Sequence, residues 1–195
     1  MIAVLERPKI TPAELLERPD RDQYELINGE LVERNMGWQS SRIGSKLLAL
    51  LETYVAEHNL GWVNGADAAY QCYEDALPED PDRIRKPDVS FIRLDRLPPE
   101  DEPEGYCQIV PDLVAEVVSP HDTIYELSLK IEEYRKAGVK LIWVVVPNTK
   151  TVTIHRLNGS MSELHDADEL TGEEVVPGFC CSIADIFRTP IPTKP

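Results

Sequence analysis

Residues 112–147 read "DLVAEVVSPHDTIYELSLKIEEYRKAGVKLIWVVVP", and this stretch decides the fold. It opens with a continuous apolar run that contains one acid, Glu116, and such runs are typical of a strand buried on both faces. Apolar residues then recur with helical spacing between Thr123 and Ala137. Thr123 and Glu126 fit a capping box and Gly138 fits a helix end, so the helix has both of its boundaries marked. The closing "LIWVVVP" predicts a second strand.

Further elements flank this unit on both sides. In "YELINGELVE", Asn28-Gly29 supplies the positive φ angles of a two-residue type I′ turn, which predicts a β-hairpin. The patterns also predict a helix over 40–57, strands over 62–74, 84–94 and 151–157, and a short helix in the tail over 173–187. Together they predict a mixed α/β (α+β) fold, with a central sheet flanked by helices and an N-terminal β-hairpin.

Length, composition and charge limit what the protein can do. We expect one domain over residues 1–195, because no repeat or low-complexity linker divides the chain. No signal peptide and no membrane-length apolar stretch is visible, so we expect a cytoplasmic protein, and the four cysteines show no metal-ligand spacing. The chain carries 35 acidic and 20 basic residues, a net charge of −15. Such a surface repels phosphate backbones, so binding to a nucleic acid would need a local basic patch or metal ions.

Two carboxylates interrupt apolar, strand-forming stretches. Asp88 heads "KPDVSFI" at 86–92, and Glu116 lies inside the apolar run described above. A buried carboxylate is costly without a compensating partner, so these acids indicate a shared ligand. We expect Asp88 and Glu116 to converge on one Mg²⁺ or Mn²⁺ ion, because hard cations take carboxylate and phosphate oxygens. Taken alone, Asp88 is also compatible with the end of an ordinary loop after Pro87.

A basic residue near these acids would complete a catalytic set. On the helix over 123–137, Lys130 lies beside the apolar stripe and not on the solvent face. Arg135 flanks the opposite edge of that stripe and is the rival candidate. We expect Lys130 to reach the acids, because its helix directly follows the strand of Glu116.

The sequence resembles the Uma family of bacterial restriction-endonuclease-like proteins, a branch of the PD-(D/E)XK nuclease superfamily. The pieces that match are "YELINGELVE", "GWQSSRIGSKLLALL", "IRKPDVSFI", "DLVAEVVSP", "LKIEEYRKAGVKLIWVVVP" and "VPGFCCSIADIF". The resemblance implies a restriction-endonuclease-like fold, with Asp88 as the aspartate of the signature and Glu116 as its second acid. The superfamily's lysine normally stands two residues after that acid, where this chain has Val118, and Lys130 matches the position to which it has migrated. Glu30 matches a common family glutamate and joins the catalytic candidates, while Ser40 stands where relatives often have a histidine.

Three functions remain open on the sequence alone. The first is a metal-dependent endonuclease that hydrolyses DNA phosphodiester bonds, working as a homodimer and binding DNA weakly without metal. The second is a catalytically silent nuclease fold that serves in binding or assembly, and the third is a hydrolase of smaller phosphate esters. For the first, we expect the nucleic acid to be contacted by a basic patch of Arg42, Lys46, Arg83 and Arg85.

Overall fold

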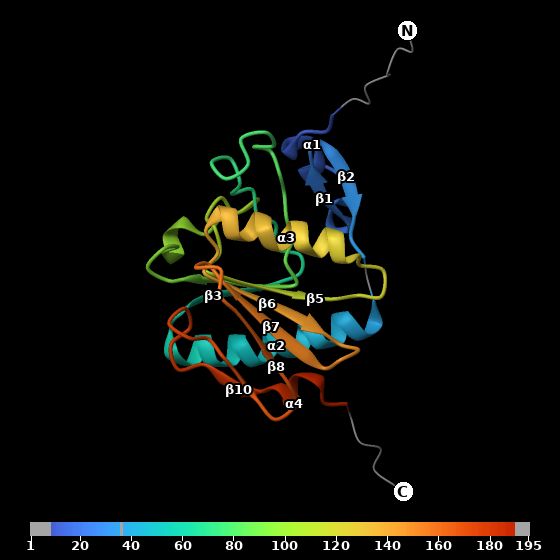
Figure 1. The fold of residues 1–195 in the computed structure, drawn as a ribbon. Helices are drawn as coiled ribbons and strands as arrows, with labels where there is room; N and C mark the ends of the chain where they lie inside the picture. The colour runs from blue at the N-terminus through green and yellow to red at the C-terminus, as the bar shows by residue number, and fades with distance from the viewer. Residues whose placement is uncertain (1–8, 36, 190–195) are drawn as a thin grey trace, which may run out of the picture.

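A six-stranded sheet forms the centre of the computed structural model, which describes residues 9–35 and 37–189 (Figure 1). The strands lie in the order β3-β4-β5-β6-β7-β8, and each pair of neighbours is antiparallel except β5 and β6, which are parallel. This is the mixed central sheet that the sequence predicted. The strands are β3 (Gly61–Gly65), β4 (Val89–Arg93), β5 (Leu113–Val117), β6 (Leu141–Val146), β7 (Thr151–Arg156) and β8 (Met161–Leu164).

Two long helices cover opposite faces of the sheet, α2 (Trp38–His58) on one and α3 (Ile124–Ala137) on the other (Figure 1). The capping box of α3 is present: the Thr123 side chain accepts from the Glu126 backbone N–H, and the Glu126 side chain accepts from the Thr123 backbone N–H. The helix ends at Gly138, whose φ of 98° is in the left-handed region. Because α3 connects two parallel strands, its first turn begins close to the end of β5.

Side chains of β5 alternate between the two faces of the sheet. Leu113, Ala115 and Val117 pack in the core beneath α2, whereas Val114 packs in the core beneath α3. Glu116 shares the face of Val114 and therefore points toward α3. The alternation places one acid in an otherwise apolar layer.

The N-terminal hairpin forms a separate small layer beside α3 (Figure 1). Its strands are β1 (Tyr24–Ile27) and β2 (Glu30–Glu33), and the turn residues Asn28 and Gly29 have φ angles of 52° and 75°. The predicted type I′ turn is therefore confirmed. Leu26 of β1 packs with Leu15 and Ile84, and its backbone pairs with that of Ile84. The hairpin is thereby attached to the segment that leads into β4.

Short elements complete the fold. The predicted tail helix is confirmed as α4 (Ile183–Phe187). Within the described ranges 9–35 and 37–189, no helix has the length and apolarity needed to cross a membrane. The remaining elements are α1 (Pro12–Leu16), 3-10 turns at Arg21–Gln23 and Pro99–Asp101, β9 (Glu169–Thr171), β10 (Cys180–Ser182) and α4 (Ile183–Phe187).

The structure differs from the sequence prediction in three places. The strand predicted over 84–94 begins only at Val89, as β4, and Ile84 and Arg85 form isolated bridges before it. The strand predicted over 62–74 ends at Gly65, and the tyrosines beyond it, Tyr70 and Tyr73, are buried in irregular backbone. Aromatic residues at these positions therefore indicate burial in the core and not an extended strand. The short strands β8, β9 and β10 were not predicted, because their largely polar residues lack a continuous apolar alternation.

Candidate active site

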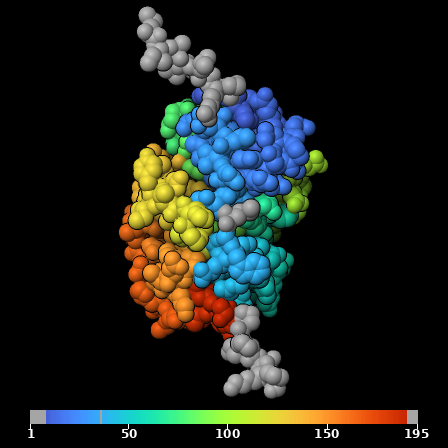
Figure 2. Space-filling view, turned by 90° about the vertical axis from the view of Figure 1, so that its right-hand side faces the viewer, coloured from blue at the N-terminus to red at the C-terminus, as the bar shows by residue number. Residues whose placement is uncertain are grey.

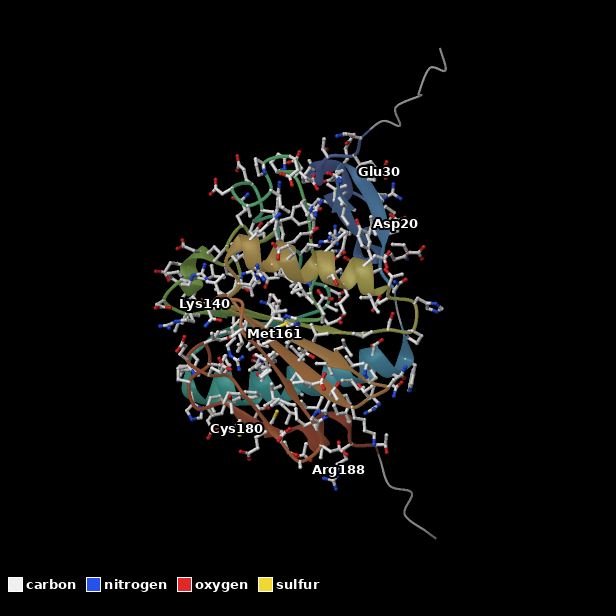
Figure 3. The ribbon with its side chains drawn as sticks, in the orientation of Figure 1. Asp20, Glu30, Lys140, Met161, Cys180 and Arg188 are labelled. Atoms are coloured by element: carbon white, nitrogen blue, oxygen red, sulfur yellow. The ribbon has the colours of Figure 1, made fainter. Side chains whose placement is uncertain are left out.

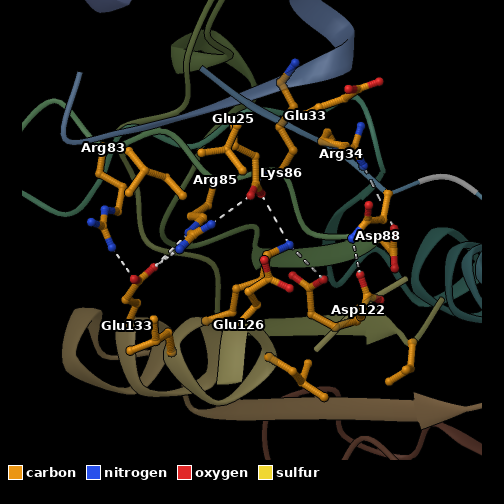
Figure 4. A pocket seen from close by; sticks show the side chains of 18 of the residues that line it. Glu25, Glu33, Arg34, Arg83, Arg85, Lys86, Asp88, Asp122, Glu126 and Glu133 are labelled. Carbon is orange, nitrogen blue, oxygen red and sulfur yellow. Dashed lines mark hydrogen bonds and ion pairs between the residues drawn. The ribbon is translucent and has the colours of Figure 1, made fainter. Parts of the chain in front are cut away.

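A cavity of about 340 Å³ lies between the hairpin, the start of β4, the end of β5 and α3 (Figure 4). On the surface, the hairpin and the first turns of α2 and α3 adjoin on one face of the molecule (Figure 2). Seven acidic and five basic side chains line the cavity, which leaves a formal excess of two negative charges. These are Glu25, Glu33, Asp88, Glu116, Asp122, Glu126 and Glu133, with Arg34, Arg83, Arg85, Lys86 and Lys130.

The structure brings Asp88 and Glu116 together in this cavity. In the antiparallel ladder of β4 and β5, Val89 pairs with Ala115, so the next positions along, Asp88 and Glu116, lie across from each other. The Val117 backbone N–H donates to Asp88 Oδ2 at 2.7 Å, which fixes the first carboxylate. Burial raises the pKa of both acids, and that of Glu116 reaches about 7, with the charge of Asp88 contributing. Close, poorly solvated carboxylates are an arrangement that a cation would relieve.

Lys130 and Tyr134 hold Glu116 from α3. Lys130 Nζ lies 3.4 Å from Glu116 Oε2, and the Tyr134 hydroxyl donates to Glu116 Oε1 at 2.6 Å. The two residues are four apart, so they project from the same face of the helix. Burial alone would lower the pKa of Lys130, but the carboxylates of Glu116 and Glu25 raise it, so the ammonium is retained. The rival Arg135 is 41% exposed and pairs instead with Glu132 at 3.2 Å.

The hairpin contributes Glu25 to the site, and not Glu30. Glu30 is exposed at the outer end of the hairpin, away from the cavity lining (Figure 3). Glu25 is buried, and its Oε1 lies 3.5 Å from Lys130 Nζ. Although burial raises the pKa of Glu25, the charges of Lys130 and Arg85 lower it to about 2, so this carboxylate stays ionised. The sequence prediction of Glu30 in the site is not supported by the geometry.

Arg83 and Arg85 belong to a buried ion-pair network and do not form an exposed basic patch (Figure 4). Arg85 lies 2.8 Å from Glu25 Oε2 and 2.6 Å from Glu133 Oε2. Arg83 pairs with the other oxygen of Glu133 and, at 2.7 Å, with Asp80. All five side chains are at most 9% exposed. The predicted role in DNA contact is therefore corrected to the packing of the hairpin and its loop against α3.

The other two residues of the predicted patch lie on α2. The Arg42 guanidinium donates to the Arg188 carbonyl oxygen at 3.2 Å, and Lys46 is exposed. Neither residue lines the cavity, so the four predicted basic residues do not form one surface.

The chain was compared with models of known protein families. The Uma2 model, described as "Putative restriction endonuclease", matches residues 12–184, nearly the whole chain. The chain belongs to the Uma2 family. A comparison with curated proteins gives no match.

The fold also has a counterpart among solved structures. A crystal structure described as "a putative nuclease belonging to DUF820 from Anabaena variabilis ATCC 29413" superposes with a TM-score of 0.74 and 21% sequence identity. The match covers 91% of this chain and 97% of that one, so the two share the whole fold. The restriction-endonuclease-like architecture expected from the Uma resemblance is thereby confirmed.

The donor set of this Uma2 protein fits an open Mg²⁺ or Mn²⁺ site and not a closed protein cage. In the ranges 9–35 and 37–189, no three His, Cys, Asp or Glu side chains are grouped as ligands of one metal ion. Asp88 and Glu116 offer two carboxylates, and Mg²⁺ commonly takes one or two carboxylates and completes its shell with water and phosphate oxygens. A divalent ion would also balance the excess of two negative charges in the cavity lining.

Ser40 and Val118, the two residues at which the resemblance led us to expect another residue type, have clear positions in the structure. Ser40 is buried at the start of α2, and its hydroxyl donates to the Gly37 carbonyl oxygen at 3.0 Å, so it acts within its own helix turn. Val118 lines the cavity two residues after Glu116. Valine carries no charge, and the positive charge beside the Glu116 carboxylate comes instead from Lys130.

Proposed function

We propose that this Uma2 protein is a metal-dependent endonuclease that hydrolyses phosphodiester bonds in DNA. One observation carries the proposal: Asp88, directly before β4, and Glu116, on the adjacent strand β5, line the same cavity, and Lys130 lies 3.4 Å from Glu116. Membership of a family described as "Putative restriction endonuclease" supports the same reading. Working as a homodimer on duplex DNA is part of the proposal, and light scattering with and without duplex tests it.

Asp88 and Glu116 would hold Mg²⁺ or Mn²⁺. When bound, such an ion supplies a Lewis acid for the phosphoryl group and an acidified water. The chain's own contribution is orientation. The Val117 N–H fixes Asp88, and Tyr134 fixes one oxygen of Glu116, which leaves its second oxygen beside Lys130. Lys130 then places a positive charge at the mouth of the carboxylate pair, where negative charge develops on the phosphoryl oxygens.

Glu25 positions Lys130 and does not need to touch substrate in this scheme. Its carboxylate accepts from Arg85 at 2.8 Å and from the Lys86 backbone N–H at 2.9 Å. This fixed anion lies 3.5 Å from the Lys130 ammonium, which lies 3.4 Å from Glu116. A charge that is already oriented costs no reorganisation during the reaction.

Cleavage assays test the proposal. Purified protein is incubated with plasmid, linear duplex and single-stranded DNA, with Mg²⁺, Mn²⁺ or a chelator, and in parallel with bis(p-nitrophenyl) phosphate as a small diester. We expect DNA cleavage that requires metal, and at least a 10²-fold loss in Glu116→Gln. Glu52→Gln, at an exposed position on α2, is the matched control and keeps the parent rate.

The outcomes separate the three functions. Hydrolysis of the small diester without cleavage of any DNA would favour the smaller-ester hydrolase, a reading consistent with the net charge of −15. Inactivity on every substrate with both metals would favour a silent fold. Metal-dependent cleavage that survives Glu116→Gln would refute the site.

A further inference from the structure

Four of the five basic side chains that line the cavity already have close partners. Arg83 and Arg85 contact carboxylates, with the shortest measured Arg85 contact at 2.6 Å. Lys86 Nζ donates to the Arg21 carbonyl oxygen at 2.8 Å. Lys130 Nζ is shared between two carboxylates, as described above. Arg83, Arg85 and Lys86 are therefore held by contacts shorter than 3 Å, and Lys130 is already directed at the two carboxylates.

Arg34 differs from the other four. It directly follows β2, lines the cavity, and its side chain is 14% exposed. Within the described part of the chain, its shortest recorded polar contact is 3.4 Å, from Nη1 to the Asp22 carbonyl oxygen. Its two carboxylate neighbours, Asp67 and Asp88, are both 3.9 Å away. These separations exceed the usual hydrogen-bond range, so most of its five N–H donors remain free for a ligand.

The position of Arg34 indicates which ligand it takes. Its Nη2 lies 3.9 Å from Asp88 Oδ1, on the carboxylate that we assign to the metal (Figure 4). A phosphate that joins a cation held by Asp88 would therefore arrive within reach of the guanidinium. The planar fork of arginine matches two phosphate oxygens, which a single ammonium does not.

We infer that Arg34 binds the non-bridging oxygens of a substrate phosphate at the mouth of this cavity. The inference rests on the proposed function for its substrate class, a nucleic-acid backbone phosphate. It assigns the phosphate contact to a residue outside the basic patch expected from the sequence.

The test measures how binding depends on salt. A fluorescent single-stranded oligonucleotide is titrated with the protein in buffer that contains Ca²⁺ in place of Mg²⁺. The dissociation constant is measured by anisotropy at several salt concentrations. In single strands each phosphate contact contributes about 0.7 to the slope of log K against log salt, so we expect Arg34→Ala to reduce the slope by about 0.7. Loss of a charged hydrogen-bonding group should weaken binding by about 10- to 100-fold.

Three further variants isolate the contact. Arg34→Lys keeps the charge and should keep the slope while losing part of the affinity, because the fork is gone. Asp67→Asn removes a carboxylate that competes for Arg34 and should tighten binding by a few fold. Arg135→Ala, on the exposed side of α3, should change neither the slope nor the affinity.

The outcomes distinguish this inference from the proposed function. If the parent binds and Arg34→Ala keeps its slope and affinity, the inference is wrong and the endonuclease proposal is untouched. If the parent binds but never cleaves, the proposal fails while the slope still decides the role of Arg34. If the parent binds no oligonucleotide, both the inference about Arg34 and the endonuclease proposal are wrong. Should Arg34→Ala fail to fold, Arg34→Gln, which can keep the contact with the Asp22 carbonyl, gives the same comparison.

Discussion

Removing the Glu133 carboxylate should destabilise the protein more than any surface change on α3. Glu133 bridges Arg83 and Arg85, and all three side chains are at most 9% exposed. Glu133→Ala leaves two buried guanidinium groups without this partner, and breaking a buried pair in this way costs about 3 to 5 kcal/mol. For a chain of this size, about 2 to 4 °C of melting temperature is lost per kcal/mol, so we expect a fall of about 6 to 20 °C.

The neighbouring residue provides the control. Glu132 is 46% exposed and pairs with Arg135, which is 41% exposed, so Glu132→Ala should cost less than about 1 kcal/mol. Urea unfolding followed by circular dichroism measures both variants against the parent. Equal stability losses in Glu132→Ala and Glu133→Ala would refute the reasoning that the network fastens the hairpin and its loop to α3.

Three further predictions concern the site. Lys130→Ala should lower turnover by about 10²- to 10³-fold with little change in metal binding. Val118→Lys in the Lys130→Ala background should restore part of the rate. Turnover equal to that of the parent in Lys130→Ala would show that Lys130 is not a catalytic residue. Tyr134→Phe should weaken Mn²⁺ binding in calorimetry by about tenfold through the lost hydrogen bond, and an unchanged affinity would show that this contact does not orient the carboxylate. Glu25→Gln should lower turnover, whereas Glu30→Gln should keep the parent rate. Lower turnover in Glu30→Gln with a parent rate in Glu25→Gln would show that Glu30, and not Glu25, belongs to the site.

The strand-helix-strand unit was predictable because its signals are local. A capping box and a terminal glycine mark α3 within the sequence itself, and both are present. Asp88 and Glu116 were also predictable, because a charged group inside an apolar run needs compensation wherever the fold places it. Lys130 followed from its angle on the helix relative to the apolar stripe.

The remainder of the site depends on packing between segments distant in sequence. Strand alternation puts Glu25 and Leu26 on opposite faces of the hairpin, so the sequence predicts that Glu25 faces water. Glu25 is buried only because the hairpin packs beside α3. The partners of Arg83 and Arg85 on α3 lie 50 and 48 residues away, so sequence spacing gave no sign of them. For the same reason, two buried arginines were interpreted as surface charges.

Mn²⁺ titration by isothermal calorimetry tests the central claim, that Asp88 and Glu116 jointly hold a divalent cation. The parent, Asp88→Asn and Glu116→Gln are compared, with Asp95→Asn, at an exposed position after β4, as the matched control. We predict weak but measurable binding in the parent and the control, and loss of binding in each site variant, because neither carboxylate alone completes the donor set. Binding of unchanged affinity in both site variants would contradict the account.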